Sequence, residues 1–280
     1  MLENPFQLSG KLILVVGAGT GIGRGVALEL ARQGADVVIS YHGSVQGAEE
    51  VVGEITRMGR RAKAIWADIG LVSDCRRLVD EAVAFLGGLD GLFNNAGITL
   101  TKDFLDVTEE EYNHLFNLNI RGHFFTCQQA VPYMVERGKK LKEENPERIW
   151  AGGSIVNMSS VHGSVGFVGH SVYAGTKGAI NAFSRELAVE LCPLHIRVNV
   201  LAPGTIEVPS YFSDPNYTAG SGGRFVPWGR VGYPEDVGYL AAYLMSDASE
   251  FMTGNILYFD GGLTAKMAID LKPPTGTRGK

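Results

Sequence analysis

The chain alternates short apolar runs, rich in β-branched residues, with longer segments of helical periodicity. The apolar runs are KLILVVG (11–17), DVVIS (36–40), AKAIWAD (62–68), DGLFNNAG (90–97), GSIVNMSS (153–160) and IRVNVLAPG (196–204). Helical periodicity fills the segments between them, at 21–34, 47–59, 75–87, 110–137 and 173–192. Strands that are apolar almost throughout and are separated by helices indicate a parallel sheet covered on both faces. The sequence therefore predicts a doubly wound α/β fold.

Charge, hydropathy and cysteine usage exclude several classes of protein. A net charge of −5 and a pI near 5.7 argue against nucleic-acid binding. The N-terminal MLENPFQLSG lacks a signal-peptide core, and no stretch reaches the roughly 18 apolar residues of a membrane span, so we expect a cytoplasmic protein with no membrane partner. The three cysteines are widely separated and form no metal-binding cluster, which predicts reduced, buried thiols and no metal site.

Two segments interrupt the alternation. The first, 136–153, mixes Lys with Glu and is expected to extend one helix into a loop with a solvated face. The second, 207–236, is rich in Gly, Pro and aromatic residues, and connections of that length are usually lids or binding segments. No linker divides the chain, so we expect a single domain over 1–280, with a core at about 8–265, a substrate loop at 207–236 and a C-terminal tail at 264–280.

A glycine-rich turn follows the first predicted strand and opens a helix. It reads VVGAGTGIG (15–23), with the spacing Gly17-xxx-Gly21-x-Gly23. Glycines allow positive φ and let backbone N–H groups approach a pyrophosphate at the N-terminus of a helix. The pattern predicts a nucleotide-binding turn; the alternative is a tight strand–helix connection that binds nothing.

A tyrosine and a lysine stand four residues apart in HSVYAGTKGA (170–179). Tyr173 and Lys177 would lie one turn apart on one face of a helix. A phenol with a pKa near 10 is a poor proton carrier at neutral pH, and a neighbouring ammonium favours its phenolate. Lowering that pKa by about 3 units requires roughly 4 kcal/mol, which a partly desolvated site can supply. Taken alone, the spacing is equally that of an ordinary surface pair.

These motifs, in this order and with Asn94-Asn95-Ala96-Gly97 between them, resemble the short-chain dehydrogenase/reductase family from about residue 8 to 265. The resemblance includes Asp68 after the third strand, Asn119 in LNIRG, Ser160 thirteen residues before Tyr173, Pro203-Gly204 and the closing FDGG (259–262). It implies a Rossmann-type sheet of about seven strands, an NAD or NADP cofactor and a homotetramer.

The same resemblance assigns catalytic roles. Tyr173 would be the general acid/base on the substrate oxygen, and Ser160 would hydrogen-bond that oxygen. Lys177 would stabilise the phenolate and hold the nicotinamide ribose, while Asn119 would support a water relay to Lys177. A serine that merely ends a strand and an asparagine bonded to buried backbone are the alternatives for Ser160 and Asn119.

The cofactor is expected to lie along the glycine turn and the ends of the following strands. The predicted contacts are Gly17, Gly19, Thr20, Gly21, Ile22, Gly23, Ser40, Tyr41, His42, Ser44, Asp68, Ile69, Asn95, Ala96, Gly97, Tyr173, Lys177, Pro203, Gly204 and Ile206. No carboxylate follows the second strand until Glu49, which removes the repulsion against a 2′-phosphate. Hydrogen bonds from Ser40, His42 and Ser44 to that phosphate favour NADP. Thr20 replaces a basic residue that many NADP members carry, so NAD is the alternative.

The substrate is indicated only by weaker features. The stretch VNMSSVHG and the extended tail resemble the bacterial glucose 1-dehydrogenase branch, which implies a sugar or polyol. The alternatives are a 3-oxoacyl-carrier-protein reductase and, in another class, a non-catalytic NADP-binding regulatory protein. His162 and His170 either meet substrate hydroxyls or are structural, and Tyr211, Phe212 and Trp228 either form a lid or pack the long loop.

Overall fold

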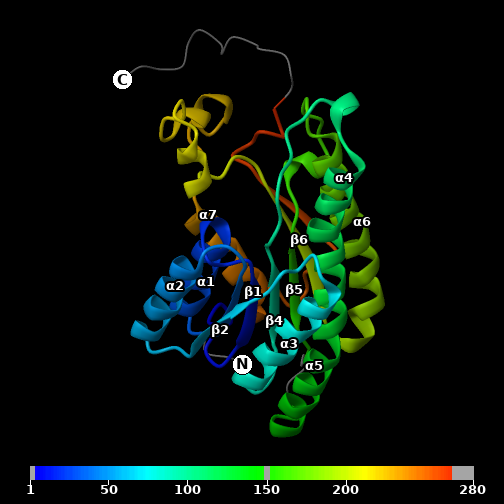
Figure 1. The fold of residues 1–280 in the computed structure, drawn as a ribbon. Helices are drawn as coiled ribbons and strands as arrows, with labels where there is room; N and C mark the ends of the chain where they lie inside the picture. The colour runs from blue at the N-terminus through cyan, green and yellow to red at the C-terminus, as the bar shows by residue number, and fades with distance from the viewer. Residues whose placement is uncertain (1–3, 148–151, 267–280) are drawn as a thin grey trace, which may run out of the picture.

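Seven parallel strands form one sheet in the order β3-β2-β1-β4-β5-β6-β7 in the computed structural model, which describes residues 4–147 and 152–266 (Figure 1). The strands are β1 (Leu12–Val16), β2 (Asp36–Tyr41), β3 (Ala62–Trp66), β4 (Gly91–Asn94), β5 (Ser154–Met158), β6 (Arg197–Pro203) and β7 (Ile256–Phe259). The predicted α/β class and the seven-stranded sheet are confirmed.

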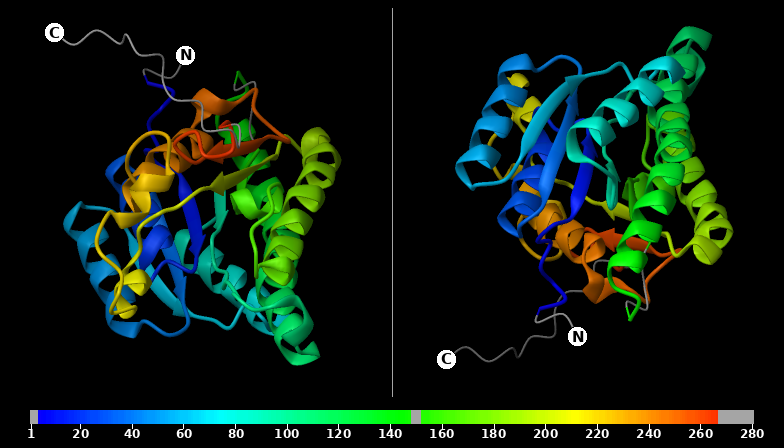
Figure 2. Two further views of the ribbon diagram at one scale, coloured as in Figure 1. Left: turned by 90° about the horizontal axis from the view of Figure 1, so that it is seen from above. Right: turned by 90° about the horizontal axis from the view of Figure 1, so that it is seen from below.

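Helices cover both faces of the sheet (Figures 1 and 2). One layer contains α1 (Gly21–Arg32), α2 (Val45–Arg57) and α7 (Pro234–Met245), and the other contains α3 (Val72–Leu86), α4 (Glu109–Phe116), α5 (Gly122–Glu144) and α6 (Ser171–Leu191). Strand β1 shows how the sequence produces two cores. Ile13 and Val15 pack under α1, α2 and α7, whereas Leu12, Leu14 and Val16 face the other layer. Each such side chain contributes about 1.5–3 kcal/mol on burial.

The long helix predicted over 110–137 is interrupted. Helix α4 passes into a π-helical turn, Asn117–Arg121, before α5 begins, and α5 then continues to Glu144. A π-turn inserts one extra residue and redirects the side chains that follow it, and periodicity alone does not reveal it. The predicted extension at 136–153 is helical as far as Glu144, while 148–151 lie outside the described residues, as does the tail from 267.

The long connection at 207–236 is ordered around short 3-10 turns at Pro209–Ser213 and Ser221–Phe225. The rings of Tyr211 and Phe212 each pack against Tyr217, with centroids 5.3 and 5.2 Å apart. Glu207 accepts hydrogen bonds from the Tyr217 hydroxyl and the Gly220 N–H, both at 2.6 Å. The loop therefore has its own internal packing.

The expectations for cysteine, metal and membrane have different outcomes. Cys75 and Cys127 are buried thiols, but Cys192 is exposed because it begins a surface turn at the end of α6, so the prediction was wrong for that residue. Within 4–147 and 152–266, no group of His, Cys, Asp and Glu is arranged to hold a metal ion. None of the helices in these described ranges has the length and apolarity needed to cross a bilayer.

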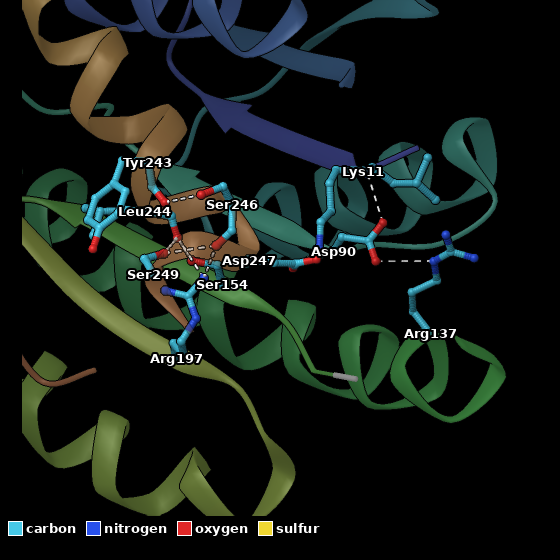
Figure 3. A network of polar contacts seen from close by, with 11 residues as sticks. Lys11, Asp90, Arg137, Ser154, Arg197, Tyr243, Leu244, Ser246, Asp247 and Ser249 are labelled. Carbon is cyan, nitrogen blue, oxygen red and sulfur yellow. Dashed lines mark hydrogen bonds and ion pairs between the residues drawn. The ribbon is translucent and has the colours of Figure 1, made fainter. Parts of the chain in front are cut away.

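A buried arginine closes the edge of the sheet where the strands begin (Figure 3). Arg197 is only 3% exposed, and its Nη2 donates to the carbonyls of Leu244 and Ser246 at 2.8 and 3.2 Å. Burial lowers the pKa of Arg197 to about 10, so the guanidinium remains charged at neutral pH. Because these carbonyls belong to the end of α7, the positive charge also meets the negative end of the helix dipole.

We expect Arg197→Met to lower the free energy of unfolding by about 3 kcal/mol, because it leaves buried carbonyls without their charged donor. Urea unfolding followed by circular dichroism measures the loss. Lys140→Met serves as the control, since the exposed Lys140–Glu136 pair contributes at most about 0.5 kcal/mol. An unchanged urea midpoint for Arg197→Met would show that this network does not stabilise the fold.

Candidate active site

The candidate residues converge at the edge where the strands end. Strand β1 lies between β2 and β4, so the chain order reverses there, and open α/β sheets bind ligands at such a switch point. The glycine turn follows β1, the Asn95–Gly97 segment follows β4, and Ser160 follows β5.

The glycine turn is packed too closely for side chains. Gly17 has φ +77°, and a Cβ on it would lie 2.6 Å from the Cβ of Ala96. A Cβ on Gly23 would lie 2.1 Å from the Gly17 carbonyl oxygen. Asn95 completes the contact, since its Nδ2 donates to the Gly17 carbonyl at 2.7 Å. These glycines therefore join the ends of β1 and β4.

The N-terminus of α1 fits an anionic group. Thr20 occupies the N-cap position without a side-chain capping bond, and no acidic residue lies in the first turn, which contains Gly21 and Ile22. The first N–H groups of a helix have no intrahelical partner, and they favour negative charge. Together with the approach that Gly19 and Gly21 permit, this arrangement fits the pyrophosphate of a dinucleotide.

The end of β2 differs in one respect from the prediction. Ser40 is 2% exposed, and its Oγ accepts the Gly17 N–H at 2.9 Å, so it supports the glycine turn from beneath. This placement does not fit the predicted contact with a 2′-phosphate. His42 is exposed and its carbonyl accepts from Trp66 Nε1 at 3.2 Å, while Ser44 makes no capping bond at the start of α2. Tyr41 ends β2 next to Gly19.

The remaining predicted cofactor contacts lie at the same edge. Asp68 follows β3 and accepts the Gly70 N–H at 2.9 Å, while Ile69 is buried against Gly122. Pro203 ends β6, and a Cβ on Gly204 would lie 2.8 Å from the Cβ of Asp260 in the FDGG turn. Ile206 is buried and pairs with Gly232 as an isolated β-bridge.

Asn119 lies in the π-turn and is completely buried. Its Oδ1 accepts the Ile98 N–H at 2.9 Å, and its Nδ2 donates to the Ile98 carbonyl at 2.8 Å and to Thr176 Oγ1 at 3.1 Å. Thr176 in turn donates to the Tyr173 carbonyl at 2.7 Å. The side chain thus ties the segment after β4 to the first turn of α6, and the water relay stays a prediction.

Lys177 is buried, and its ammonium hydrogen-bonds to the main chain. It is 3% exposed, and its Nζ donates to the Met158 carbonyl at 3.0 Å. The same Nζ lies 5.5 Å from the centroid of the Tyr173 ring, and a Cβ on Gly97 would lie 3.4 Å from it. Desolvation lowers the pKa of Lys177 to about 8.

The pKa of Tyr173 moves opposite to the sequence-based expectation. Burial raises it above its usual value, and the hydrogen bond with Ser160 offsets only part of this effect. Ser160 Oγ accepts the His162 N–H at 3.3 Å, which directs the serine hydroxyl hydrogen away from its own turn. The side chains of this chain therefore keep the phenol protonated at neutral pH.

An aromatic cluster packs against Tyr173. The His162 ring lies 5.5 Å from the Tyr173 ring and 4.8 Å from His170, and Phe167 contacts both histidines at 5.7 and 5.3 Å. Both nitrogens of His170 have partners, the Val168 carbonyl at 3.0 Å and Thr101 Oγ1 at 3.1 Å. His170 thus joins two loops beside the candidate site. Desolvation, with a smaller effect of His170, lowers the pKa of His162.

The predicted lid residues have different positions. Tyr211 adds to the rise in the pKa of Tyr173, after the larger effect of burial. Trp228 is 76% exposed, and its main-chain N–H donates to the Gly261 carbonyl at 3.0 Å. Two further residues near the site, Thr176 and His123, were not predicted from the sequence. Thr176 lies within the Tyr173–Lys177 motif, and His123 stands four residues after Asn119. Their spacing from these motifs is the sequence signal that could have indicated both.

The fold and this site define a nucleotide-dependent oxidoreductase of the Rossmann type. The model of a family described as Enoyl-(Acyl carrier protein) reductase matches residues 17–264. The Hydroxynaphthalene reductase-like protein Arp2 of Metarhizium brunneum is 39% identical in an alignment of 274 residues that covers 93% of this chain and 97% of that protein. Versicolorin reductase 1 of Dothistroma septosporum is 36% identical in an alignment of 275 residues that covers 94% of this chain and 99% of that protein.

A solved structure of a dehydrogenase has the same fold over nearly the whole chain. Acetoin dehydrogenase from Enterobacter cloacae superimposes with a TM-score of 0.83 at 32% identity, covering 94% of this chain and 99% of that one. The chain belongs to the short-chain dehydrogenase/reductase family and is an oxidoreductase that acts on CH–OH or carbonyl groups. Members of this family use NAD or NADP.

Because Lys177 is buried, we expect its replacement to raise the free energy of unfolding by an amount that depends on pH. The pKa of this lysine is about 8 against an ordinary value of 10.5, so the folded state resists the charged form. The penalty is fully present below about pH 8 and disappears as the pH rises to about 10.5, where the unfolded lysine also loses its proton. We expect Lys177→Met to be more stable than the parent by about 1–2 kcal/mol at pH 7, after allowing for the unpaired Met158 carbonyl.

Urea unfolding of both proteins across this pH range measures the difference, which should shrink as the pH rises and change sign above about pH 10, where only the cost of the unpaired Met158 carbonyl remains. The exposed Lys140→Met is the matched control and should show no such trend. A Lys177→Met variant that is less stable at pH 7 would contradict the assigned desolvation.

Proposed function

We propose that this protein is an NADP-dependent reductase that converts a carbonyl on a hydroxylated aromatic ring system into the alcohol. Tyr173 is the proton donor to the carbonyl oxygen, Ser160 hydrogen-bonds that oxygen, and Lys177 holds the nicotinamide ribose. A bound nicotinamide cofactor supplies the hydride that reaches the carbonyl carbon. Each turnover therefore adds one hydride and the Tyr173 proton to the C=O group.

The protonation state of Tyr173 supports the direction of reaction. Because burial raises its pKa, the phenol carries its proton at neutral pH and is ready to act as an acid. The buried ammonium of Lys177, 5.5 Å from the ring, stabilises the phenolate that remains after the transfer. Proton transfer from a positioned side chain contributes about 10²–10⁴-fold to the rate.

The aromatic cluster beside Tyr173 is the observation that carries the substrate proposal. The rings of His162, Phe167 and His170 offer stacking and edge contacts to a planar substrate, and both His170 nitrogens already have partners. A sugar would need a polar partner for each buried hydroxyl. Relatives described as hydroxynaphthalene and versicolorin reductases support the same reading. The sugar or polyol substrate and the carrier-protein substrate stay predictions that the same assays address.

The cofactor preference rests on the end of β2. Tyr41, His42 and Ser44 follow one another there without a carboxylate, and the first acidic residue is Glu49 in α2. This composition accepts the 2′-phosphate of NADP, whereas an acidic residue would repel it. Because the Ser40 hydroxyl bonds the Gly17 N–H, His42 and Ser44 are the side chains that can contact the phosphate.

Two exposed apolar faces support a homotetramer. Phe124 on α5 and Val189 on α6 are 47% and 73% exposed, and Tyr239 on α7, in the other layer, is 60% exposed. Two different self-complementary interfaces generate a tetramer.

We expect light scattering to give four times the chain mass of 30.1 kDa, and Val189→Glu to reduce it to a dimer. A monomer mass for the parent would contradict the proposal. The cytoplasmic location stays a prediction.

A substrate panel tests the function directly. Hydroxylated tetralones, acetoin, glucose, a polyol and an acetoacetyl thioester are assayed with NADPH and NADH by loss or gain of the reduced-nicotinamide absorbance. We expect the highest kcat/KM for a tetralone with NADPH. Tyr173→Phe should lower kcat by about 10²–10⁴-fold while the Kd for NADPH stays within about twofold.

Tyr133→Phe removes a phenolic hydroxyl of α5 that donates to Asp80 of α3 at 2.8 Å, and it provides the control with parental activity. Full activity of Tyr173→Phe would overturn the mechanism, and glucose as the best substrate would overturn the aromatic assignment alone.

A further inference from the structure

A completely buried histidine lies behind the candidate cofactor site. His123 is in the first turn of α5, directly after the π-turn that carries Asn119, and is 0% exposed. Its side chain lies against Ala96, which follows the end of β4. Helix α5 and strand β4 are in contact in the fold (Figure 1). None of the catalytic steps above uses it.

The hydrogen bond of His123 fixes its tautomer. Its Nε2 lies 3.0 Å from the Ala96 carbonyl oxygen, which can only accept. Burial, with a smaller effect of the Lys177 charge, lowers the pKa of His123 to about 3, so the ring is neutral and has a single N–H. That hydrogen must be on Nε2 for the contact to be a hydrogen bond.

The contact is half of a reciprocal clamp. The Asn94 side chain, at the end of β4, donates from Nδ2 to the main-chain carbonyl of His123 at 3.4 Å, while the His123 side chain donates to the main chain of Ala96. On its other side the Ala96 N–H donates to the Val16 carbonyl at 3.0 Å, and Ala96 touches Gly17. His123 therefore holds the Ala96–Gly97 peptide through its carbonyl, while β1 holds the preceding Asn95–Ala96 peptide through its N–H.

We propose that His123 is a positioning residue that holds the Ala96–Gly97 peptide against the glycine turn and thereby sets the affinity for the nicotinamide nucleotide. This inference rests on the proposed function, in that it takes the Asn95–Gly97 segment as part of the cofactor site. Gly97 lies beside Lys177 and Asn119, so rotation of this peptide would displace the surface where the cofactor ribose is expected. His123 acts through Ala96 and does not touch the cofactor.

The second ring nitrogen helps to separate positioning from folding. His123 Nδ1 is buried and, within the described ranges, has no hydrogen-bond partner, so its removal breaks no contact. His123→Leu therefore removes only the donor to Ala96, whereas the amide of His123→Gln keeps a donor that can reach the same carbonyl.

Binding of NADPH and of NADH to the parent, His123→Leu and His123→Gln is measured by nucleotide fluorescence, with thermal unfolding of each protein in parallel. We expect His123→Leu to raise both Kd values about tenfold and His123→Gln to stay within about threefold of the parent. Unchanged Kd values for His123→Leu, or equally weak binding by both variants, would overturn the inference. A parent that binds neither nucleotide would refute the proposed function as well.

A second measurement does not need a folded leucine variant. The ¹⁵N spectrum of the imidazole in the parent should show the neutral, Nε2-protonated form from about pH 5 to 8, although a free histidine titrates in that range. Titration in that range, or protonation on Nδ1, would overturn the clamp.

Discussion

Close backbone contact between the ends of β1 and β4 is the constraint on which the rest of the site depends. Gly17 leaves no room for a Cβ against Ala96, and Asn95 closes the contact by donating to the Gly17 carbonyl at 2.7 Å. The two strands are neighbours only because the chain order reverses at β1. The same reversal opens the edge of the sheet to a ligand, so one packing contact both joins the halves of the fold and positions the nucleotide turn.

Desolvation changes the pKa of both side chains in the Tyr173–Lys177 pair. Burial lowers the pKa of Lys177 to about 8 and raises that of Tyr173, so both groups are moved towards their neutral forms. A buried ammonium beside a buried phenol costs stability, and the family chemistry requires both groups. At the opposite edge of the sheet the Arg197 guanidinium is also desolvated, but it donates to the carbonyls of Leu244 and Ser246. Buried cations thus lie at both ends of the strands, and each donates to a main-chain carbonyl oxygen.

Much of the fold and the site could be predicted because parallel βα units repeat one rule. Each strand ends at the same edge, so Gly17, Asn95, Ser160 and Tyr173 had to converge once the alternation was recognised. The exceptions have a common cause. Ser40 lies under the glycine turn, Cys192 is on the surface, and the π-turn interrupts the helix predicted over 110–137. These outcomes depend on packing between distant segments, which local pattern does not encode.

The sequence by itself determined the α/β class, the family and the candidate pair Tyr173 and Lys177, because periodicity and ordered motifs are local properties. Tertiary structure decided the electrostatics and the surroundings of that pair. The pKa of Tyr173 rises because burial outweighs the hydrogen bond from Ser160, and neither effect can be read from spacing. The aromatic cluster of His162, Phe167 and His170 forms only in the folded chain. The same is true of the hydrogen bond from His123 to Ala96, which lies 27 residues earlier in the sequence.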